Sequence, residues 1–249
     1  MCDLIFRWTR LNTYSQYKRT LVLKNVPISY EDRKNGKSRR HWVAVPVKKS
    51  NPRGYGGVAI IWRENIDHLI KILPDGTERI QCVEINSNND TNFLVASVYL
   101  PSKGSHDYID EFYDCIDQLY EIYQKYQGTH KIIIGGDLNE DLNNEKTNKR
   151  KTYLFDFIKE CGLSYDISGK TFIKPNGEEC SELDYFLHTI NYKFCTKKEV
   201  LNNTITNVSD HHPVKMTIML DHDIKNLKEG EKKQHSPEGK MGKGWYRLV

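Results

Sequence analysis

Short apolar runs separated by polar turns recur along the chain from residue 57 onward, and they predict strands. The runs "GGVAIIW" and "NFLVASVYLP" are bounded by glycine or proline and are apolar throughout, which favours interior strands, whereas "RIQCVEIN" alternates more and predicts one wetter face. "KIIIGGDLN" ends in polar residues, "ELDYFLH" begins with them, and "PVKMTIML" alternates like a half-buried strand. These six segments predict a β-rich core.

Two other segments have apolar side chains at three- and four-residue steps, which favours amphipathic helices. The first runs from Ile109 to Tyr126 with acids in its first turn, and the second covers "YLFDFIKECGL" and ends at Gly162. After Leu220 the chain is charged and without period, which is typical of a linker or tail. Many strands with few interspersed helices predict a mixed pair of sheets covered by helices.

Length and charge refine this expectation. The chain has 249 residues, enough to bury a substantial core, and we expect one domain. The formal net charge is only +4, but residues 1–53 carry thirteen Lys and Arg against three acids. This asymmetry indicates either a polyanionic partner or a solvated, partly disordered leader, and charge alone does not decide between them.

The six cysteines are scattered, with no CxxC pair and no signal peptide ahead of them, so neither a zinc site nor a disulfide framework is indicated. We therefore expect a reducing, intracellular compartment, nuclear or cytoplasmic, and no secretion. No apolar run approaches the roughly 20 residues that a membrane helix needs, so we expect no membrane partner.

Three acid-containing clusters lie where predicted strands end or begin: Asp137 with Asn139, Asp184, and Asp210 with His211. Any one of them alone is ordinarily a cap or turn residue, because a sheet interior does not tolerate an unpaired charge. Together they fit phosphodiester hydrolysis. An Asp beside a His fixes the imidazole tautomer, a second Asp orients or deprotonates water, and an Asn holds a phosphate oxygen without adding charge.

These clusters, with "VYLP" at Tyr99 and "TF" at Thr171, follow the order and approximate spacing of known motifs. The sequence resembles the endonuclease/exonuclease/phosphatase superfamily and, within it, the endonuclease domains of non-LTR retrotransposons, which are similar to apurinic/apyrimidinic endonucleases. "RGYGGVAIIWR" is also typical of those retroelement domains. The similarity divides the chain into a basic leader over residues 1–40, the domain over 41–220 and a charged flexible tail over 221–249.

The resemblance implies a four-layer α/β sandwich, an α+β fold in which two packed mixed β-sheets are flanked by helices. It also implies hydrolysis of DNA by water, with Mg²⁺ (or Mn²⁺) as cofactor, at one end of the sandwich. The chain would then fit a fragment of a larger retroelement polyprotein.

Family roles can be carried over residue by residue. Asp137 would orient or activate the water, and Asn139 would bind the scissile phosphate. His211, held by Asp210, would donate to a phosphate oxygen and neutralise transition-state charge, and Asp210 and Asp137 would contact the metal. The remaining matches would support the phosphate: Tyr99, Thr171, Asp184 and Ser209.

The N-terminal segment departs from the family pattern. The family normally brings an Asn at the end of its first strand and a Glu that is its main metal ligand, and residues 1–40 match neither. Glu31 is the nearest candidate, but its context differs. Since Mg²⁺ prefers octahedral oxygen ligation with a firm carboxylate, this predicts a domain incomplete at its N-terminal side, with weakened or absent catalysis.

Two alternatives therefore stay open. The chain could be a catalytically inactive nucleic-acid-binding module, which predicts salt-sensitive affinity without nicking. It could also be a phosphatase or phosphodiesterase of the same superfamily that acts on a substrate other than nucleic acid, such as an inositol lipid or sphingomyelin.

Overall fold

The structure is a computed structural model. It describes residues 2–10, 17–25, 40–44, 58–87, 92–103, 108–191, 195–201 and 209–218, the first three ranges by their backbone. Glu31 and the predicted tail over residues 221–249 lie outside the described residues.

A mixed five-stranded sheet forms the centre of the molecule, in the order β11-β8-β7-β6-β5. Its strands are β5 (Ile70–Thr77), β6 (Ile80–Ile85), β7 (Asn92–Tyr99), β8 (His130–Asp137) and β11 (Asp184–His188). Strands β7 and β8 pair in parallel, and the other neighbours pair antiparallel. The predicted strands that correspond to β6, β7, β8 and β11 are thus confirmed, whereas the sequence pattern does not predict β5.

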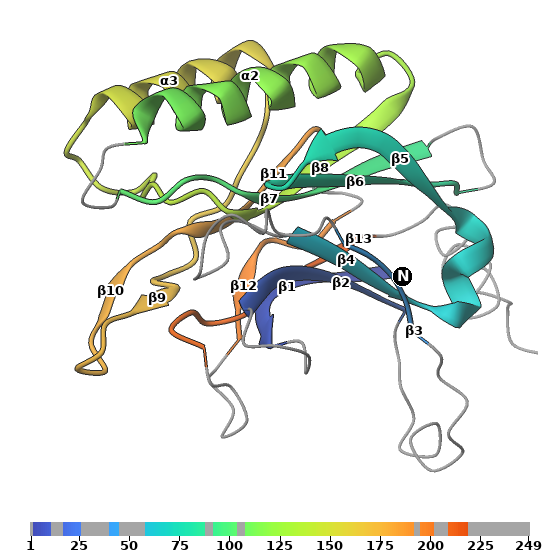
Figure 1. Cartoon of the computed structure of the whole chain (residues 1–249), viewed down its shortest axis with the longest axis horizontal. Coiled ribbons are helices and arrows are strands. Elements are labelled where there is room, and N and C mark those ends of the chain that lie inside the picture. Colours follow the sequence, from blue (N-terminus) through green and yellow to red (C-terminus); the bar gives the residue numbers. More distant parts are fainter. Residues whose placement is uncertain are drawn as a thin grey trace, which may run out of the picture.

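Helices α2 (Ile109–Tyr126) and α3 (Lys149–Glu160) lie side by side over one face of this sheet (Figure 1). Their buried side chains, such as Phe112 and Leu154, share one apolar cluster with Ile132 and Ile134 of β8. Side chains alternate along a strand, so Ile133 between them faces the opposite side and belongs to a second cluster. Both faces of β8 are therefore buried, as its continuous apolar run predicts.

A six-stranded sheet, in the order β12-β13-β1-β2-β4-β3, contributes to that second cluster. Its strands are β1 (Cys2–Arg10), β2 (Tyr17–Asn25), β3 (Arg40–Ala44), β4 (Val58–Arg63), β12 (Glu199–Val200) and β13 (Val214–Ile218). Ile60 of β4 and Met216 of β13 are fully buried in it with Val95, Ile133 and Phe186 of the central sheet. A 3-10 helix, η1 (Glu64–Leu69), connects β4 to β5.

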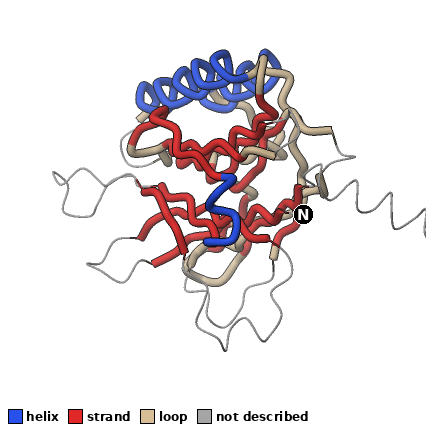
Figure 2. The backbone as a smooth tube through the Cα atoms, turned by 90° about the vertical axis from the view of Figure 1, so that its right-hand side faces the viewer, coloured by secondary structure: helices blue, strands red, loops and turns tan. Residues whose placement is uncertain are grey.

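Strands β1 and β2 lie within the segment that the sequence predicts as a basic leader. They pair with each other, and through β13 on one side and β4 on the other they enter the six-stranded sheet. Figure 2 shows helices above one band of strands, with a second band on the side away from the helices. The mixed α/β fold is confirmed, while the outer helical layer of the four-layer prediction is not found among the described residues.

The fold brings two acids to one sheet edge. Asp137 ends β8, Asp184 begins β11, and the two are direct partners in the antiparallel ladder. Gly136, just before Asp137, lies so close to β7 that an added Cβ would be 2.0 Å from the Val98 carbonyl oxygen. A larger residue would push the two strands apart, so this glycine helps to set the position of Asp137.

Candidate active site

Three titratable side chains from distant parts of the sequence meet at this edge. Asp137, Asp184 and His211 are 0%, 1% and 5% exposed, and one possible ligand atom from each lies within 4.8 Å of the others. His211 Nδ1 lies 2.7 Å from Asp184 Oδ2, and its Nε2 lies 3.9 Å from Asp137 Oδ2. The first distance is a hydrogen bond, whereas the second is too long for one.

The structure corrects one predicted contact. The sequence assigns Asp210 as the partner that holds His211, but the Nδ1 atom contacts the Asp184 carboxylate. Asp210 is exposed, and it is not a member of the metal-ligating group found among the described residues. The backbone carbonyl oxygen of Asp210 accepts the Ile173 N–H at 2.8 Å, so this residue helps to hold the segment that carries the histidine.

A short hairpin fixes the position of His211. Strand β9 (Phe172–Ile173), which pairs with β10 (Glu179–Ser181), forms an antiparallel bridge between Phe172 and His211. The two rings lie 5.2 Å apart between centroids. Ser209 Oγ accepts the His211 backbone N–H at 3.0 Å, a local turn of the kind that serine favours. Ser209 thus helps to position the His211 backbone, while its support of the phosphate stays a prediction.

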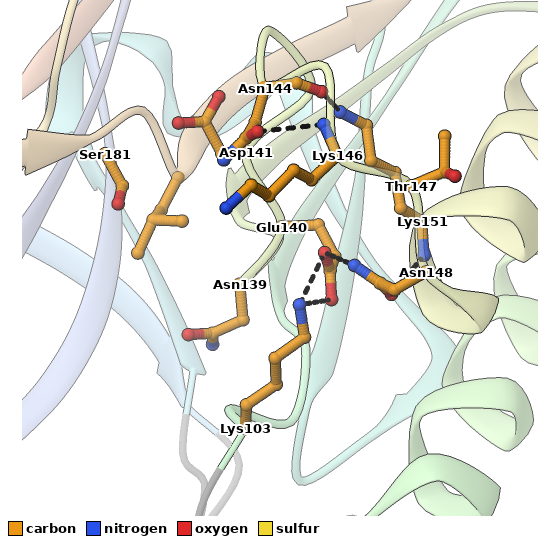
Figure 3. Close-up of a pocket in the computed structure, with 11 residues that line it drawn as sticks. Lys103, Asn139, Glu140, Asp141, Asn144, Lys146, Thr147, Asn148, Lys151 and Ser181 are labelled. Atoms are coloured by element: carbon orange, nitrogen blue, oxygen red, sulfur yellow. Dashed lines mark hydrogen bonds and ion pairs between the residues drawn. The ribbon is translucent and has the colours of Figure 1, made fainter.

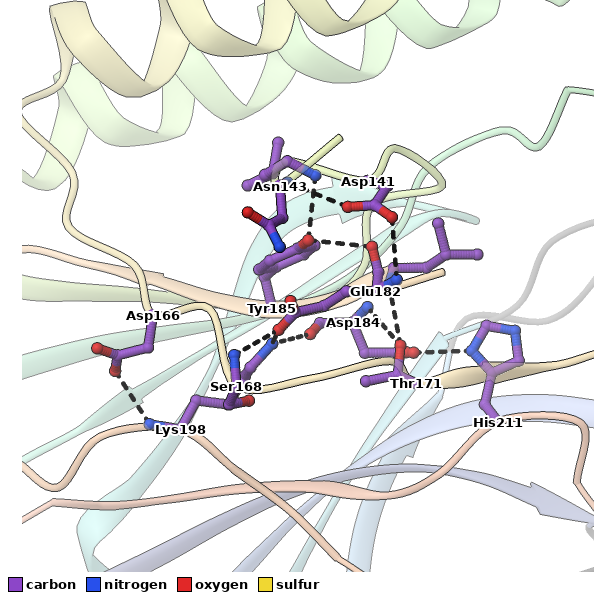
Figure 4. A network of polar contacts seen from close by, with 12 residues as sticks. Asp141, Asn143, Asp166, Ser168, Thr171, Glu182, Asp184, Tyr185, Lys198 and His211 are labelled. Atoms are coloured by element: carbon purple, nitrogen blue, oxygen red, sulfur yellow. Dashed lines mark hydrogen bonds and ion pairs between the residues drawn. The ribbon is translucent and has the colours of Figure 1, made fainter. Parts of the chain in front are cut away.

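Asp184 is held through both of its peptide groups (Figure 4). Thr171 Oγ1, which is fully buried, accepts the backbone N–H groups of Leu183 at 2.9 Å and Asp184 at 3.2 Å. The Lys198 ammonium donates to the Asp184 carbonyl oxygen at 2.8 Å and also to the Glu182 carboxylate. This clamp orients the carboxylate that binds His211.

Lys198 and Glu182 form a buried ion pair, with side chains 1% and 4% exposed. The Lys198 ammonium lies 4.2 Å from the Tyr185 ring centroid, and its backbone N–H donates to Asp166 at 3.0 Å. Burial lowers the pKa of Lys198, and the Glu182 carboxylate opposes that shift. Sequence reasoning missed both members of the pair, because "TKKEV" and "SELDY" carry no signal that distinguishes them from surface charges.

Asn139 and Tyr99 lie beside Asp137. Asp137 Oδ1 accepts the Asn139 backbone N–H at 2.8 Å, and the Asn139 amide donates to the Leu100 carbonyl oxygen at 2.6 Å. Asn139 has φ of 51°, a conformation that asparagine tolerates better than most residues. Tyr99 is the register partner of Asp137 across β7 and β8, and the Arg79 guanidinium lies 5.1 Å from its ring centroid.

The donor set fits a divalent cation. Two buried carboxylates and one imidazole converge within 4.8 Å, and carboxylate oxygens are the ligands that hard divalent ions prefer. Because buried charges need a counterion, a cation between Asp137 and Asp184 would compensate charge that the fold has already removed from water. The group differs from the predicted pair, Asp210 and Asp137, by containing Asp184 and His211.

A pocket of about 410 Å³ opens beside Asn139 (Figure 3). The pocket is lined by Ser181 and Leu183, which precede Asp184, and by the loop that leads into α3. Asn139 and Leu183, which are close in sequence to Asp137 and Asp184, thus connect the pocket to the Asp137, Asp184 and His211 group.

The fold and this site resemble those of the endonuclease/exonuclease/phosphatase superfamily. Residues 93–215, just under half of the chain, match the sequence profile of the family described as endonuclease-reverse transcriptase. The match covers all the site motifs that the sequence predicted, from Tyr99 to His211.

Solved structures share the fold. The endonuclease domain of TRAS1, a telomere-specific non-LTR retrotransposon, is 19% identical with a TM-score of 0.53, covering 72% of this chain and 79% of that one. The 3′ phosphatase NExo from Neisseria, bound to a product DNA hairpin, is 16% identical with a TM-score of 0.54, covering 71% and 79%. The 3′-5′ exonuclease NExo from Neisseria meningitidis is 17% identical with a TM-score of 0.51, covering 72% and 80%.

No curated protein matches the chain in sequence. Within the described part of the chain, no helix has the length and apolar character needed to cross a bilayer.

Proposed function

We propose that this domain is a metal-dependent phosphodiesterase that cuts DNA, in the manner of retroelement endonucleases. The observation that carries the proposal is the buried convergence of Asp137, Asp184 and His211 at the edge of the central sheet. The likeness to the TRAS1 endonuclease domain and to a DNA-bound Neisseria phosphatase supports this substrate class. We further propose an intracellular protein that works as part of a larger retroelement product.

The hydrogen bond to Asp184 fixes the tautomer of His211. With Nδ1–H donated to the carboxylate, Nε2 points toward Asp137 at 3.9 Å. A protonated Nε2 can donate to a phosphate oxygen and reduce the charge that builds up in the transition state. Asp137 Oδ2, on the other side, can orient a water for attack and accept its proton.

Asn139 lies next to these groups and lines the pocket, and its amide donates to the Leu100 carbonyl oxygen. An amide binds a phosphate oxygen without adding charge, which suits the scissile group. The carboxylates of Asp137 and Asp184 would hold Mg²⁺ or Mn²⁺, which when bound polarises the phosphate and neutralises its charge. The burial of both carboxylates strengthens each of these interactions, because the local dielectric constant is below that of water.

Nicking of supercoiled plasmid tests the proposal. Purified protein is incubated with plasmid and Mg²⁺, with and without chelator, beside Asp137→Ala, His211→Ala and Asp184→Asn. We expect chelator-sensitive nicking that falls by about 10²–10³-fold in each variant, as when a transition-state donor is removed. Glu178→Gln, an exposed change on the loop between β9 and β10, is the control and should cut like the wild type.

Asp210→Asn separates the two possible partners of His211. Because Asp184 contacts the imidazole, Asp184→Asn should lower the nicking rate more than Asp210→Asn does. Nicking that survives the Asp137 and His211 substitutions would show that the residues are wrongly assigned. Unchanged plasmid together with salt-dependent retention on DNA would favour a catalytically inactive DNA-binding module. The sequence raises this alternative because residues 1–40 do not match the Glu that is the family's main metal ligand.

A further inference from the structure

The pocket beside Asn139 contains a buried cation that lacks an acidic partner in the described part of the chain. Lys151 is only 2% exposed and lines the pocket, yet its ammonium donates to the Asn144 carbonyl oxygen and to no carboxylate there. The ring of Phe155 lies 5.4 Å from the ammonium and is no substitute for a counterion. A buried charge of this kind calls for an anion.

The acids of the pocket are already engaged. Glu140, 3% exposed, accepts from Arg150 Nε at 3.0 Å, from Lys103 at 2.8 Å and from Asn148 at 3.1 Å, so one carboxylate serves two cations. The Asp141 carboxylate accepts two backbone N–H groups, those of Asn143 and Glu182. The pocket and its supporting shell therefore carry an excess of positive charge.

A further cation, Lys146, points its ammonium into the pocket between Asp141 and Asn139 (Figure 3). Its backbone N–H is held by Asn144 Oδ1 at 3.0 Å, which fixes the loop that presents the side chain. Asn148 caps α3 by accepting the Lys151 N–H at 3.0 Å, so the positive end of this 12-residue helix lies at the same place. The loop is thus held in a conformation that presents several positive groups to one space.

We propose that this pocket binds a phosphate group of the DNA strand next to the scissile phosphate. The inference rests on the proposed function, because Asn139, the residue expected to bind the scissile phosphate, lines this pocket. Lys146 and Lys151 supply the charge, Asn148 supplies an amide donor, and Glu140 keeps Lys103 and Arg150 in place. The subsite positions the strand and takes no part in the chemistry.

Binding to a short labelled DNA duplex tests the subsite without catalysis. Fluorescence anisotropy is measured at several salt concentrations in the presence of chelator, for the wild type, Lys146→Ala and Lys151→Gln. Each variant should weaken binding and reduce the slope of log affinity against log salt by about one, the value for one lost phosphate contact. Lys149→Ala is the matched control, because Lys149 is exposed on the same segment and does not line the pocket.

A neutral methylphosphonate in place of each phosphate, one position at a time, locates the contact. At one position next to the cleavage site the substitution should weaken wild-type binding and leave Lys146→Ala unaffected. If Lys151→Gln does not fold, Lys146→Ala alone tests whether the subsite binds a phosphate. Equal salt slopes for Lys146→Ala and Lys149→Ala, or no DNA binding by the wild type, would overturn the subsite. If these two salt slopes are equal but chelator-sensitive nicking persists, the subsite is overturned and the proposed function stands.

Discussion

The buried pair of Lys198 and Glu182 offers a sharp test of how the site is supported. In Lys198→Met the side chain keeps a similar volume, but the Glu182 carboxylate, 4% exposed, loses its cation. Breaking a buried ion pair by removing one partner costs about 3–5 kcal/mol, because the remaining charge stays desolvated. That is a large part of the roughly 5–15 kcal/mol that stabilises a typical domain.

Three contacts disappear together in this variant. The ammonium no longer donates to Glu182 or to the Asp184 carbonyl oxygen, and it no longer lies over the Tyr185 ring. Glu182 keeps the Ser168 N–H as a donor at 2.9 Å, which is not enough to balance a full charge. The free energy of unfolding should therefore fall by about 3–5 kcal/mol, and most of it should return in the double variant Lys198→Met/Glu182→Met, in which no charge is left buried.

Urea unfolding followed by tryptophan fluorescence measures this change, since Trp62 is 4% exposed in the core and reports its loss. Lys174→Met is the control, because the Lys174–Glu178 pair is exposed and its removal should leave stability unchanged within error. The reasoning is refuted if Lys198→Met is no less stable than the control, or if the double variant is as unstable as the single one.

Three further outcomes follow from the described residues. Burial lowers the pKa of His188 below its ordinary value of 6.5, so the unfolded chain binds more protons than the folded one at pH values between the folded and unfolded pKa. The free energy of unfolding should therefore fall as pH drops below about 6.5. Urea midpoints measured from about pH 5 to 8 should vary less in His188→Asn than in the wild type. Thr171→Val removes the acceptor of two buried N–H groups and should lower the free energy of unfolding by about 1–3 kcal/mol, measured by the same titration. Burial raises the pKa of Cys82 to about 12, so at about pH 8 this thiol should react with Ellman's reagent far more slowly than the partly exposed Cys180.

Much of the fold could be predicted, because its core strands are buried on both faces and read as unbroken apolar runs. The strand of Ile132, Ile133 and Ile134 and the helix containing Phe112 and Leu119 carry their burial pattern in the sequence. Strands β1 and β2 were not predicted as part of the domain. Their segment is rich in basic residues, and nothing local indicates that its backbone pairs with β13 and β4.

The candidate site could be predicted in its members and only partly in its contacts. Asp137, Asp184 and His211 stand out because each is a polar residue at the end of an apolar run, and the structure brings them together. Lys198 could not be found this way, since its burial depends on Glu182 and on the packing of Tyr185, which no local pattern encodes. A buried ion pair is a tertiary property and becomes visible only when both elements are in place.

The partner of His211 illustrates why neighbours in sequence were misleading. Asp210 lies in a bend just before the Phe172–His211 bridge, and adjacency in sequence does not bring its carboxylate to the imidazole. Asp210 is exposed whereas His211 is buried, so the two side chains lie in different environments. The carboxylate that reaches the imidazole must therefore come from another strand, and Asp184, clamped at the start of β11, is the one that the sheet supplies. Any variant that shifts β11 relative to β13 should consequently disturb His211 even though its own segment is unchanged.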